Sequence, residues 1–185
     1  MTETFGGRLL VATPALVDPN FDRTVILVLE HSADGGSLGI VLNRPTATPI
    51  VEAVPDWAAL AAAPAVVYIG GPVGLGTLIA LARSRTDEPP PGAERVSDRL
   101  VAVDLSRDPE PLAPLVSGLR VWTGYAGWSP GQLEAEVAQD AWWVCDARDD
   151  DVTGVEPNEL WRSVLARQPG TLSWFANFPD DPAHN

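Results

Sequence analysis

Residues 127–131, Gly-Trp-Ser-Pro-Gly, match the pattern G-x-S-x-G, which could carry nucleophilic chemistry. In hydrolases this pattern forms a sharp turn between a strand and a helix, and the turn exposes the serine hydroxyl. Here the residue after Ser129 is Pro130, which has no N–H group to stabilise an oxyanion. The same residues also fit a helix start, with Ser129 as N-cap, Pro130 at the first helical position and Gln132 completing a capping box. We therefore predict a helix cap and no catalytic serine.

A second group of residues, two arginines and an asparagine, could bind an anion. The runs 24–31 and 37–43 flank the turn sequence SADGG and predict a β-hairpin with a five-residue loop. Pairing across this hairpin places Val25 near Asn43 and Thr24 near Arg44, within a residue of register. Arg23, Asn43 and Arg44 then converge at the open end of the hairpin.

Two interpretations of this cluster stay open. One is a structural network, in which Asp18 or Asp22 pairs with the arginines and holds the preceding loop to the sheet. The other is an anion pocket completed by the turn at Gly70 and Gly71, although a tight turn with positive φ also explains those glycines. The candidate ligand-binding residues are therefore Arg23, Asn43, Arg44, Gly70 and Gly71.

The remaining chemically active side chains do not assemble into a catalytic or metal-binding set. Glu30 and His31 are neighbours on a strand, so they point to opposite faces. Cys145 lies in an apolar run and is expected to be a buried, inert thiol. The acidic run 149–151 lacks the spacing of a calcium loop. We predict no catalytic residues, no metal site and no cofactor.

Strands outnumber helices along the chain, and hairpin connections dominate. This pattern predicts an α+β fold with a mixed, mainly antiparallel sheet. An exposed, mobile loop is expected at 84–98, which has three consecutive prolines, and a polar loop at 148–155. The other expected strands are 8–12, 66–69, 77–82, 100–103, 119–125 and 141–146, and the expected helices are 50–63 with a break at Pro55, 110–117, 130–139 and 156–168.

Three segments carry a resemblance to a known family: GRLLVATPALVDPNFDRTVILVLEHSADGGSLGIVLNRP (7–45), VYIGGP (67–72) and TGYAGWSPGQL (123–133). Together they resemble the YqgE/AlgH family of bacterial proteins, over about residues 5–147. The resemblance implies a strongly bent sheet folded into a pseudo-barrel with helices packed outside. The family has no agreed biochemical activity, although its AlgH branch is sometimes labelled a transcriptional regulator. We expect one domain of this family at 1–170 and a partly ordered C-terminal extension at 171–185.

The charge balance limits the partners that the chain could bind. Its 185 residues include 25 acidic and 12 basic side chains, which give a formal net charge of −13. All basic residues are arginine, so lysine-based catalysis is excluded. Such a field repels a phosphate backbone, and we expect no direct nucleic-acid binding. A single cysteine and no apolar run long enough to span a bilayer are typical of a cytoplasmic protein that does not enter the membrane.

These observations favour a non-catalytic binding or regulatory domain that acts through a protein partner or a small anion. The alternative is an enzyme that acts on a small anionic metabolite at the Arg23, Asn43 and Arg44 cluster. A regulatory effect on transcription would then run through another protein, because the chain has no basic helix for DNA. The oligomeric state is left open by the sequence.

Overall fold

The computed structural model of the protein describes residues 4–179, and it confirms the α+β fold. The helices are α1 (Ile50–Ala53), α2 (Gln132–Ala138), α3 (Asp149–Thr153) and α4 (Pro157–Ala166), with 3₁₀ helices η1 (Pro55–Leu60) and η2 (Gly170–Asn177). The strands are β1 (Arg8–Ala12), β2 (Val25–Ser32), β3 (Gly36–Val41), β4 (Pro45–Pro49), β5 (Val66–Ile69), β6 (Val73–Ser84), β7 (Ala93–Arg95), β8 (Leu100–Val103), β9 (Val116–Trp128) and β10 (Trp142–Asp146).

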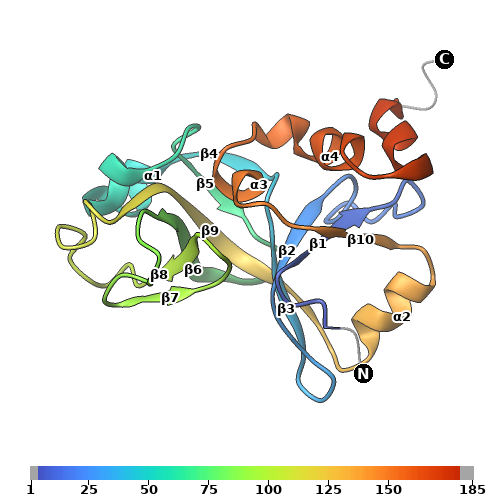
Figure 1. Ribbon diagram of the computed structural model, residues 1–185, viewed down its shortest axis with the longest axis horizontal. Helices are drawn as coiled ribbons and strands as arrows, with labels where there is room; N and C mark the ends of the chain where they lie inside the picture. The colour runs from blue at the N-terminus through green and yellow to red at the C-terminus, as the bar shows by residue number, and fades with distance from the viewer. Residues whose placement is uncertain (1–3, 180–185) are drawn as a thin grey trace.

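A single strongly curved sheet connects all of these strands. Its main path runs β10-β1-β2-β3-β9-β6-β8-β7, and the β4–β5 pair joins through a parallel contact between β5 and β9. The C-terminal part of β9 pairs with β3 and its N-terminal part with β6, so this strand crosses the whole molecule (Figure 1). All the other pairs in the path are antiparallel. The predicted bent, mainly antiparallel sheet is therefore confirmed.

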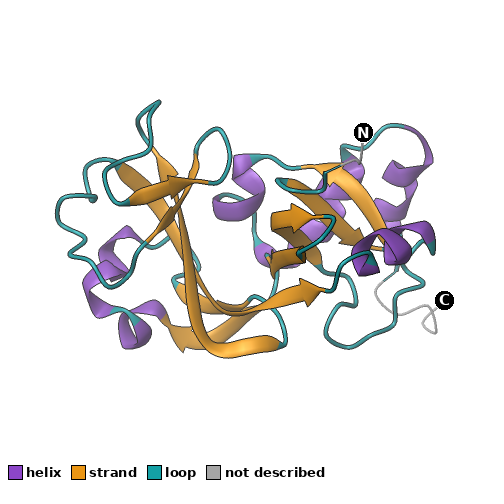
Figure 2. Cartoon of the chain, turned by 90° about the horizontal axis from the view of Figure 1, so that it is seen from below, coloured by secondary structure: helices purple, strands orange, loops and turns teal. Residues whose placement is uncertain are grey.

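Each half of the sheet has its own helical cover. On one face of β1–β3, side chains including Leu9 and Leu27 pack against Trp161 and its neighbours on α4. On the other face, Ile26 and its neighbours pack against Leu133 of α2. The far half of the sheet is covered by α1 and η1, whose Ile50 and Trp57 join its buried cluster. Figure 2 shows the long strands between these helices, as expected for helices packed outside a bent sheet.

The β2–β3 hairpin has the predicted pairing near its turn, and a bulge shifts the pairing at its open end by one residue. Ile26 lies opposite Val41, whereas His31 lies opposite Ser37, so the pairing shifts by one residue at Leu29. Ser32 pairs with Gly36, so the connection is residues 33–35, and the extra residue of the bulge increases the local twist. The register therefore places Asn43 and Arg44 beside the start of β2, as the sequence predicted.

Three expected elements differ from the structure, and a further strand was not expected. The segment 45–49 forms β4, because prolines are tolerated on an edge strand that pairs only with β5. The expected loop at 84–98 contains β7, which pairs with β8. The polar loop at 148–155 contains α3, and the expected helix at 110–117 is a series of turns interrupted by prolines. Within the C-terminal extension, η2 packs near α4, while residues 180–185 lie outside the described part.

Candidate functional site

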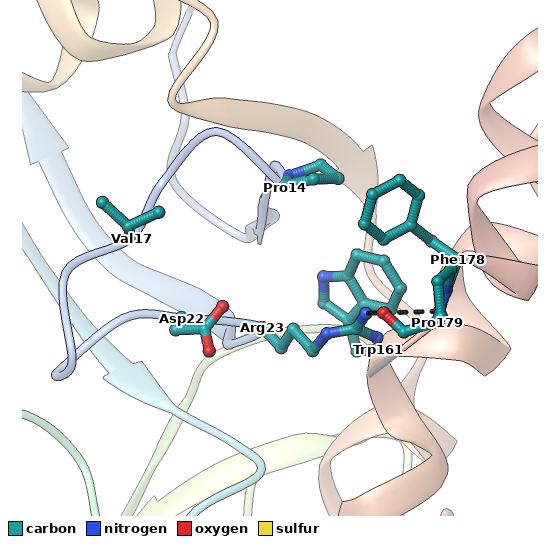
Figure 3. Close-up of a pocket in the computed structure, with 7 residues that line it drawn as sticks. All are labelled: Pro14, Val17, Asp22, Arg23, Trp161, Phe178 and Pro179. Carbon is teal, nitrogen blue, oxygen red and sulfur yellow. Dashed lines mark hydrogen bonds between the residues drawn. The ribbon is translucent and has the colours of Figure 1, made fainter. Parts of the chain in front are cut away.

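Arg23 lies in the turn that leads into β2, with its backbone in the left-handed region at φ +52°. Its guanidinium lies 4.6 Å from the ring centre of Trp161 on α4, an arrangement in which the cation is attracted to the ring face. Its Nη2 donates to the main-chain carbonyls of Phe178, at 3.2 Å, and of Pro179. Figure 3 shows the side chain extended toward these groups. Arg23 thus connects the loop before β2 to α4 and the C-terminal segment.

Asn43 uses both ends of its amide within the hairpin. Its Oδ1 accepts the Val25 N–H at 2.9 Å, and its Nδ2 donates to the Arg23 carbonyl at 2.9 Å. The residue is 7% exposed. Because both polar groups are satisfied internally, Asn43 closes the open end of the hairpin.

Arg44 reaches the same end of the hairpin from the segment between β3 and β4. Its Nη2 donates to the main-chain carbonyl of Asp22, the residue before Arg23. Within residues 4–179, no ion pair joins Asp18 or Asp22 to either arginine, and Asp18 instead accepts the Asn20 N–H at 2.9 Å. The expected carboxylate partners are therefore replaced by main-chain carbonyls.

Gly70 and Gly71 make a close contact between backbones. A Cβ on Gly71, at φ +156°, would lie 2.2 Å from the carbonyl of Tyr125, and one on Gly70 would lie 2.3 Å from the Gly124 oxygen. The Gly70 N–H donates to Thr123 at 2.9 Å, and the Gly70 carbonyl accepts the Val41 N–H at 2.8 Å. Glycine is needed here so that the β5–β6 turn can lie against β9, and the main-chain groups of Gly70 are already paired.

A cavity of about 220 Å³ adjoins Arg23 and combines aromatic with charged walls. Figure 3 shows the Asp22 carboxylate at the end opposite to the Arg23 guanidinium. The cavity is lined by Pro14, Val17, Asp22, Arg23, Trp161, Phe178 and Pro179.

The G-x-S-x-G turn differs in detail from the predicted cap. Helix α2 begins at Gln132, and its N-cap is Gly131 in the left-handed region at φ +76°, so Ser129 lies two residues before the cap. Half of the expected box remains, because the Ser129 N–H donates to Gln132 Oε1 at 3.1 Å. Pro130 follows the serine directly, so this turn has no oxyanion donor at that position.

A second G-x-S-x-G sequence, residues 35–39, was missed by sequence reasoning. Its Ser37 Oγ lies 2.8 Å from His31 Nδ1, and His31 Nε2 lies 3.6 Å from Glu134 Oε1. The His31 side chain is only 3% exposed, with its ring against the edge of Phe5. Because Ser37 lies within a strand, it lacks the strand-to-helix turn of a nucleophile elbow. The triplet instead fastens α2 to the hairpin.

The other candidate groups are engaged in the interior. Cys145 is 2% exposed, and burial raises the pKa of its thiol to about 11, so it is the inert thiol expected. From the acidic run, Asp151 is fully buried and pairs with Arg167 through two hydrogen bonds of 2.5 and 2.6 Å. Among the described residues, His, Cys, Asp and Glu form no group that could hold a metal ion.

An exposed apolar surface was also missed. Ile69, Val73, Leu75 and Leu78 are 42, 42, 58 and 41% exposed. Ile69 and Leu78 flank Thr123 on its two sides, and the Leu75 side chain lies over Gly124, so these side chains cover one region of β9. The sequence signal for this surface is the absence of any charged residue from Trp57 to Ala82.

The family is shown by comparison with known proteins. A model of the AlgH-like family matches residues 9–173. The chain belongs to the AlgH-like family. It is 49% identical to a UPF0301 protein of Streptomyces coelicolor, with 100% of this chain and 98% of the relative covered, and 46% identical to one of Mycobacterium tuberculosis, with 97% and 90% covered.

Two solved structures of bacterial proteins share this fold. The crystal structure of protein DIP2367 from Corynebacterium diphtheriae has a TM-score of 0.86 at 34% identity, covering 93% of this chain and 91% of that one. The solution structure of AlgH from Pseudomonas aeruginosa has a TM-score of 0.70 at 27% identity, covering 98% and 97%. The family match extends beyond the residues 5–147 that carried the resemblance and includes α4. In the described part of the chain, none of the helices has the length and hydropathy to cross a bilayer.

Proposed function

We propose that this AlgH-like protein is a non-catalytic, regulatory binding domain of the cytoplasm that recognises a protein partner through its apolar surface. The observation that carries the proposal is the exposure of Ile69, Val73, Leu75 and Leu78 on the two strands that flank β9. Exposed apolar patches of this kind mark interaction sites on folded proteins. The buried, unpaired Cys145 fits a reducing compartment.

The edge of β6 adds a second means of binding beside this surface. In the described sheet, β8 pairs only with the C-terminal part of β6, from Leu81 to Arg83. The outer edge of the N-terminal part of β6 therefore has no neighbouring strand in the described residues. An extended segment of a partner can use such an edge for main-chain hydrogen bonds while it covers the apolar side chains.

Charge favours a different protein over a second copy of this chain. Each copy carries −13, so two copies repel each other at low ionic strength. A partner segment with apolar side chains and a neutral or basic flank would avoid this repulsion. We therefore assign the surface to such a segment.

Site-specific photo-crosslinking in living host cells tests this assignment. A photoreactive amino acid at Leu75 should give one discrete adduct, whose partner is identified by mass spectrometry and then shown to bind with purified proteins. The control position is Val51 on α1, which is apolar and 55% exposed. Adducts only with a second copy, or the same adducts from both positions, would contradict the proposal.

A second candidate function is the binding of a small anion at the Arg23 end of the hairpin. The observation that favours it is the cavity beside Arg23. Asn43, Gly70 and Gly71 would support the backbone there, and Arg44 would supply a second positive charge. Sulfate should then raise the melting temperature of the wild type but not that of Arg44→Ala. If the site belonged to an enzyme, catalysis would depend on Asp22. Apart from Arg23, it is the only ionisable side chain among the described residues of the cavity.

A further inference from the structure

Four of the twelve basic residues line one hollow on the surface, far from the hairpin end in sequence. Arg83 lies near the C-terminal end of β6, and Arg85 follows that strand. Arg99 precedes β8, and Arg148 is the N-cap of α3. The hollow has a volume of about 580 Å³ and is lined by Arg83, Ser84, Arg85, Arg99, Arg148, Asp149 and Asp150.

The internal pairing of these arginines is incomplete. Arg83 Nη2 bonds to Asp150, but its Nε is buried and has no hydrogen-bond partner within residues 4–179. Among the described side chains, Arg99 reaches only Asp87, at 3.6 Å, and that aspartate side chain is 96% exposed. For the guanidinium groups of Arg85 and Arg148, the described residues provide no hydrogen bond or ion pair. The exposed guanidinium groups of Arg85 and Arg148 can therefore donate to an acceptor in the hollow, whereas the Arg83 Nε is enclosed by the protein.

The two carboxylates of the hollow do not balance the arginines. The four arginines and two aspartates that line the hollow give a formal charge of +2, or +1 with Asp87 beside Arg99, within a chain whose net charge is −13. Asp149 is moreover held by the Ser97 hydroxyl at 2.7 Å. A bound anion would neutralise this local excess of positive charge.

We propose that this hollow binds a small phosphorylated molecule. Guanidinium groups match phosphate oxygens with paired, charge-assisted hydrogen bonds, and several of them together favour a ligand with two or more negative charges. The volume falls in the range of small-molecule sites, roughly 300–1,000 Å³. A nucleic-acid polymer fits less well, because its many phosphates would meet the acidic surface around the hollow.

This site shares no residue with the apolar surface or with the Arg23 cavity. It is built by β6, the segment before β8 and α3, which contribute no residue to the Arg23 cavity. A phosphorylated ligand here would act as an effector of the binding domain. Its binding can therefore fail or succeed separately from the proposed function.

Titration calorimetry with inorganic pyrophosphate at low ionic strength tests the site. The wild type should bind one equivalent with a sub-millimolar dissociation constant. The double variant Arg85→Gln/Arg148→Gln changes two exposed side chains and should bind at least tenfold more weakly. The control Arg107→Gln removes an exposed arginine that pairs with Asp104 at 3.3 Å outside the hollow, and its binding should be unchanged.

A spectroscopic measurement makes the test specific to the hollow. The Nε–H signals of Arg85 and Arg148 should shift in the ¹H–¹⁵N spectrum as pyrophosphate is added, because these exposed guanidinium groups gain an acceptor. Saturable binding with this shift supports the proposal. No saturable binding, or equal weakening in the double variant and in Arg107→Gln, would overturn it, since the second result indicates only a general effect of charge.

Discussion

Asn43 shows most clearly how one residue of the candidate site acts on the fold. Its amide joins the Val25 N–H to the Arg23 carbonyl, and both bonds are shielded from water. Asn43→Ala should therefore lower the free energy of unfolding by about 1–3 kcal/mol, because a buried donor loses its partner. Urea denaturation measures this, with Asn20→Ala in the exposed loop as the control. A loss no larger than that of the control would contradict the structural role.

Arg44 separates the two interpretations of the arginine cluster. A buried carboxylate left without its arginine would destabilise the protein by about 3–5 kcal/mol. The partner is instead the Asp22 carbonyl, so Arg44→Ala should lower the free energy of unfolding by only about 0.5–1.5 kcal/mol. Chemical denaturation in sulfate-free buffer measures this. A loss of 3 kcal/mol or more would indicate a carboxylate partner after all.

Cys145 gives a prediction about pH. Burial raises its thiol pKa from 9.0 to about 11, so between these values the unfolded chain loses the proton while the folded protein keeps it. The free energy of unfolding should therefore be unaffected by this thiol below pH 9. It should fall by up to roughly 3 kcal/mol as the pH rises from 9 toward 11. The pH dependence of unfolding should be shallower in Cys145→Ala across this range. Identical slopes in the two proteins would contradict the raised pKa.

At the scale of elements, α2 shows a helix start that the sequence located within two residues. The hydroxyl of Ser129 is not its cap, so Ser129→Ala should change the free energy of unfolding by less than about 0.5 kcal/mol. Gly131→Ala should lower it by about 1 kcal/mol, because Gly131 has a positive φ that alanine adopts with strain. Thermal denaturation compares the two variants. A larger effect of Ser129→Ala would indicate that the Ser129 hydroxyl caps α2 after all.

Labelling of Ser129 tests whether the protein has hydrolase activity at this turn. A fluorophosphonate probe should leave Ser129 unlabelled, because Pro130 provides no oxyanion donor. Mass spectrometry of the treated protein locates any adduct. An adduct on Ser129 would require a catalytic interpretation of this turn.

The elements that the sequence predicted well are those with local signals. The hairpin strands and β5, β8 and β10 have alternating or continuous apolar residues between turn residues, which is sufficient to locate a strand. Helix α3 could not be predicted, because its acidic sequence is stabilised by the pair between Asp151 and Arg167 on the distant end of α4. Strand β7 likewise depends on pairing with β8.

At the scale of the whole molecule, charge leads to a prediction about DNA. The net charge of −13 opposes binding to a phosphate backbone. We expect no sequence-selective binding to promoter fragments at physiological salt in gel-shift measurements. Specific complexes have dissociation constants of about 10⁻⁸–10⁻¹¹ M, so a selective shift at sub-micromolar protein would contradict this expectation.

The sites show which features of the molecule a sequence can reveal. Arg23, Asn43 and Arg44 could be brought together in advance because one hairpin connects them. The arginines of the hollow could not, because residues 83–85, 99 and 148 meet only through the curvature of the sheet and the position of α3. The apolar surface could not be predicted from the sequence for a related reason. A strand without charged residues has the same pattern whether it is buried or exposed, and only its neighbours in the fold distinguish the two.

The most direct test of the proposed function is the affinity for the partner identified by crosslinking at Leu75. We expect Leu75→Gln to weaken binding of the purified partner at least tenfold, because it places an amide in the centre of the apolar surface. Val51→Gln, a matched change of an exposed apolar residue on α1, should leave the affinity unchanged. Equal affinities for the wild type and Leu75→Gln would contradict the assignment of this surface to a protein partner.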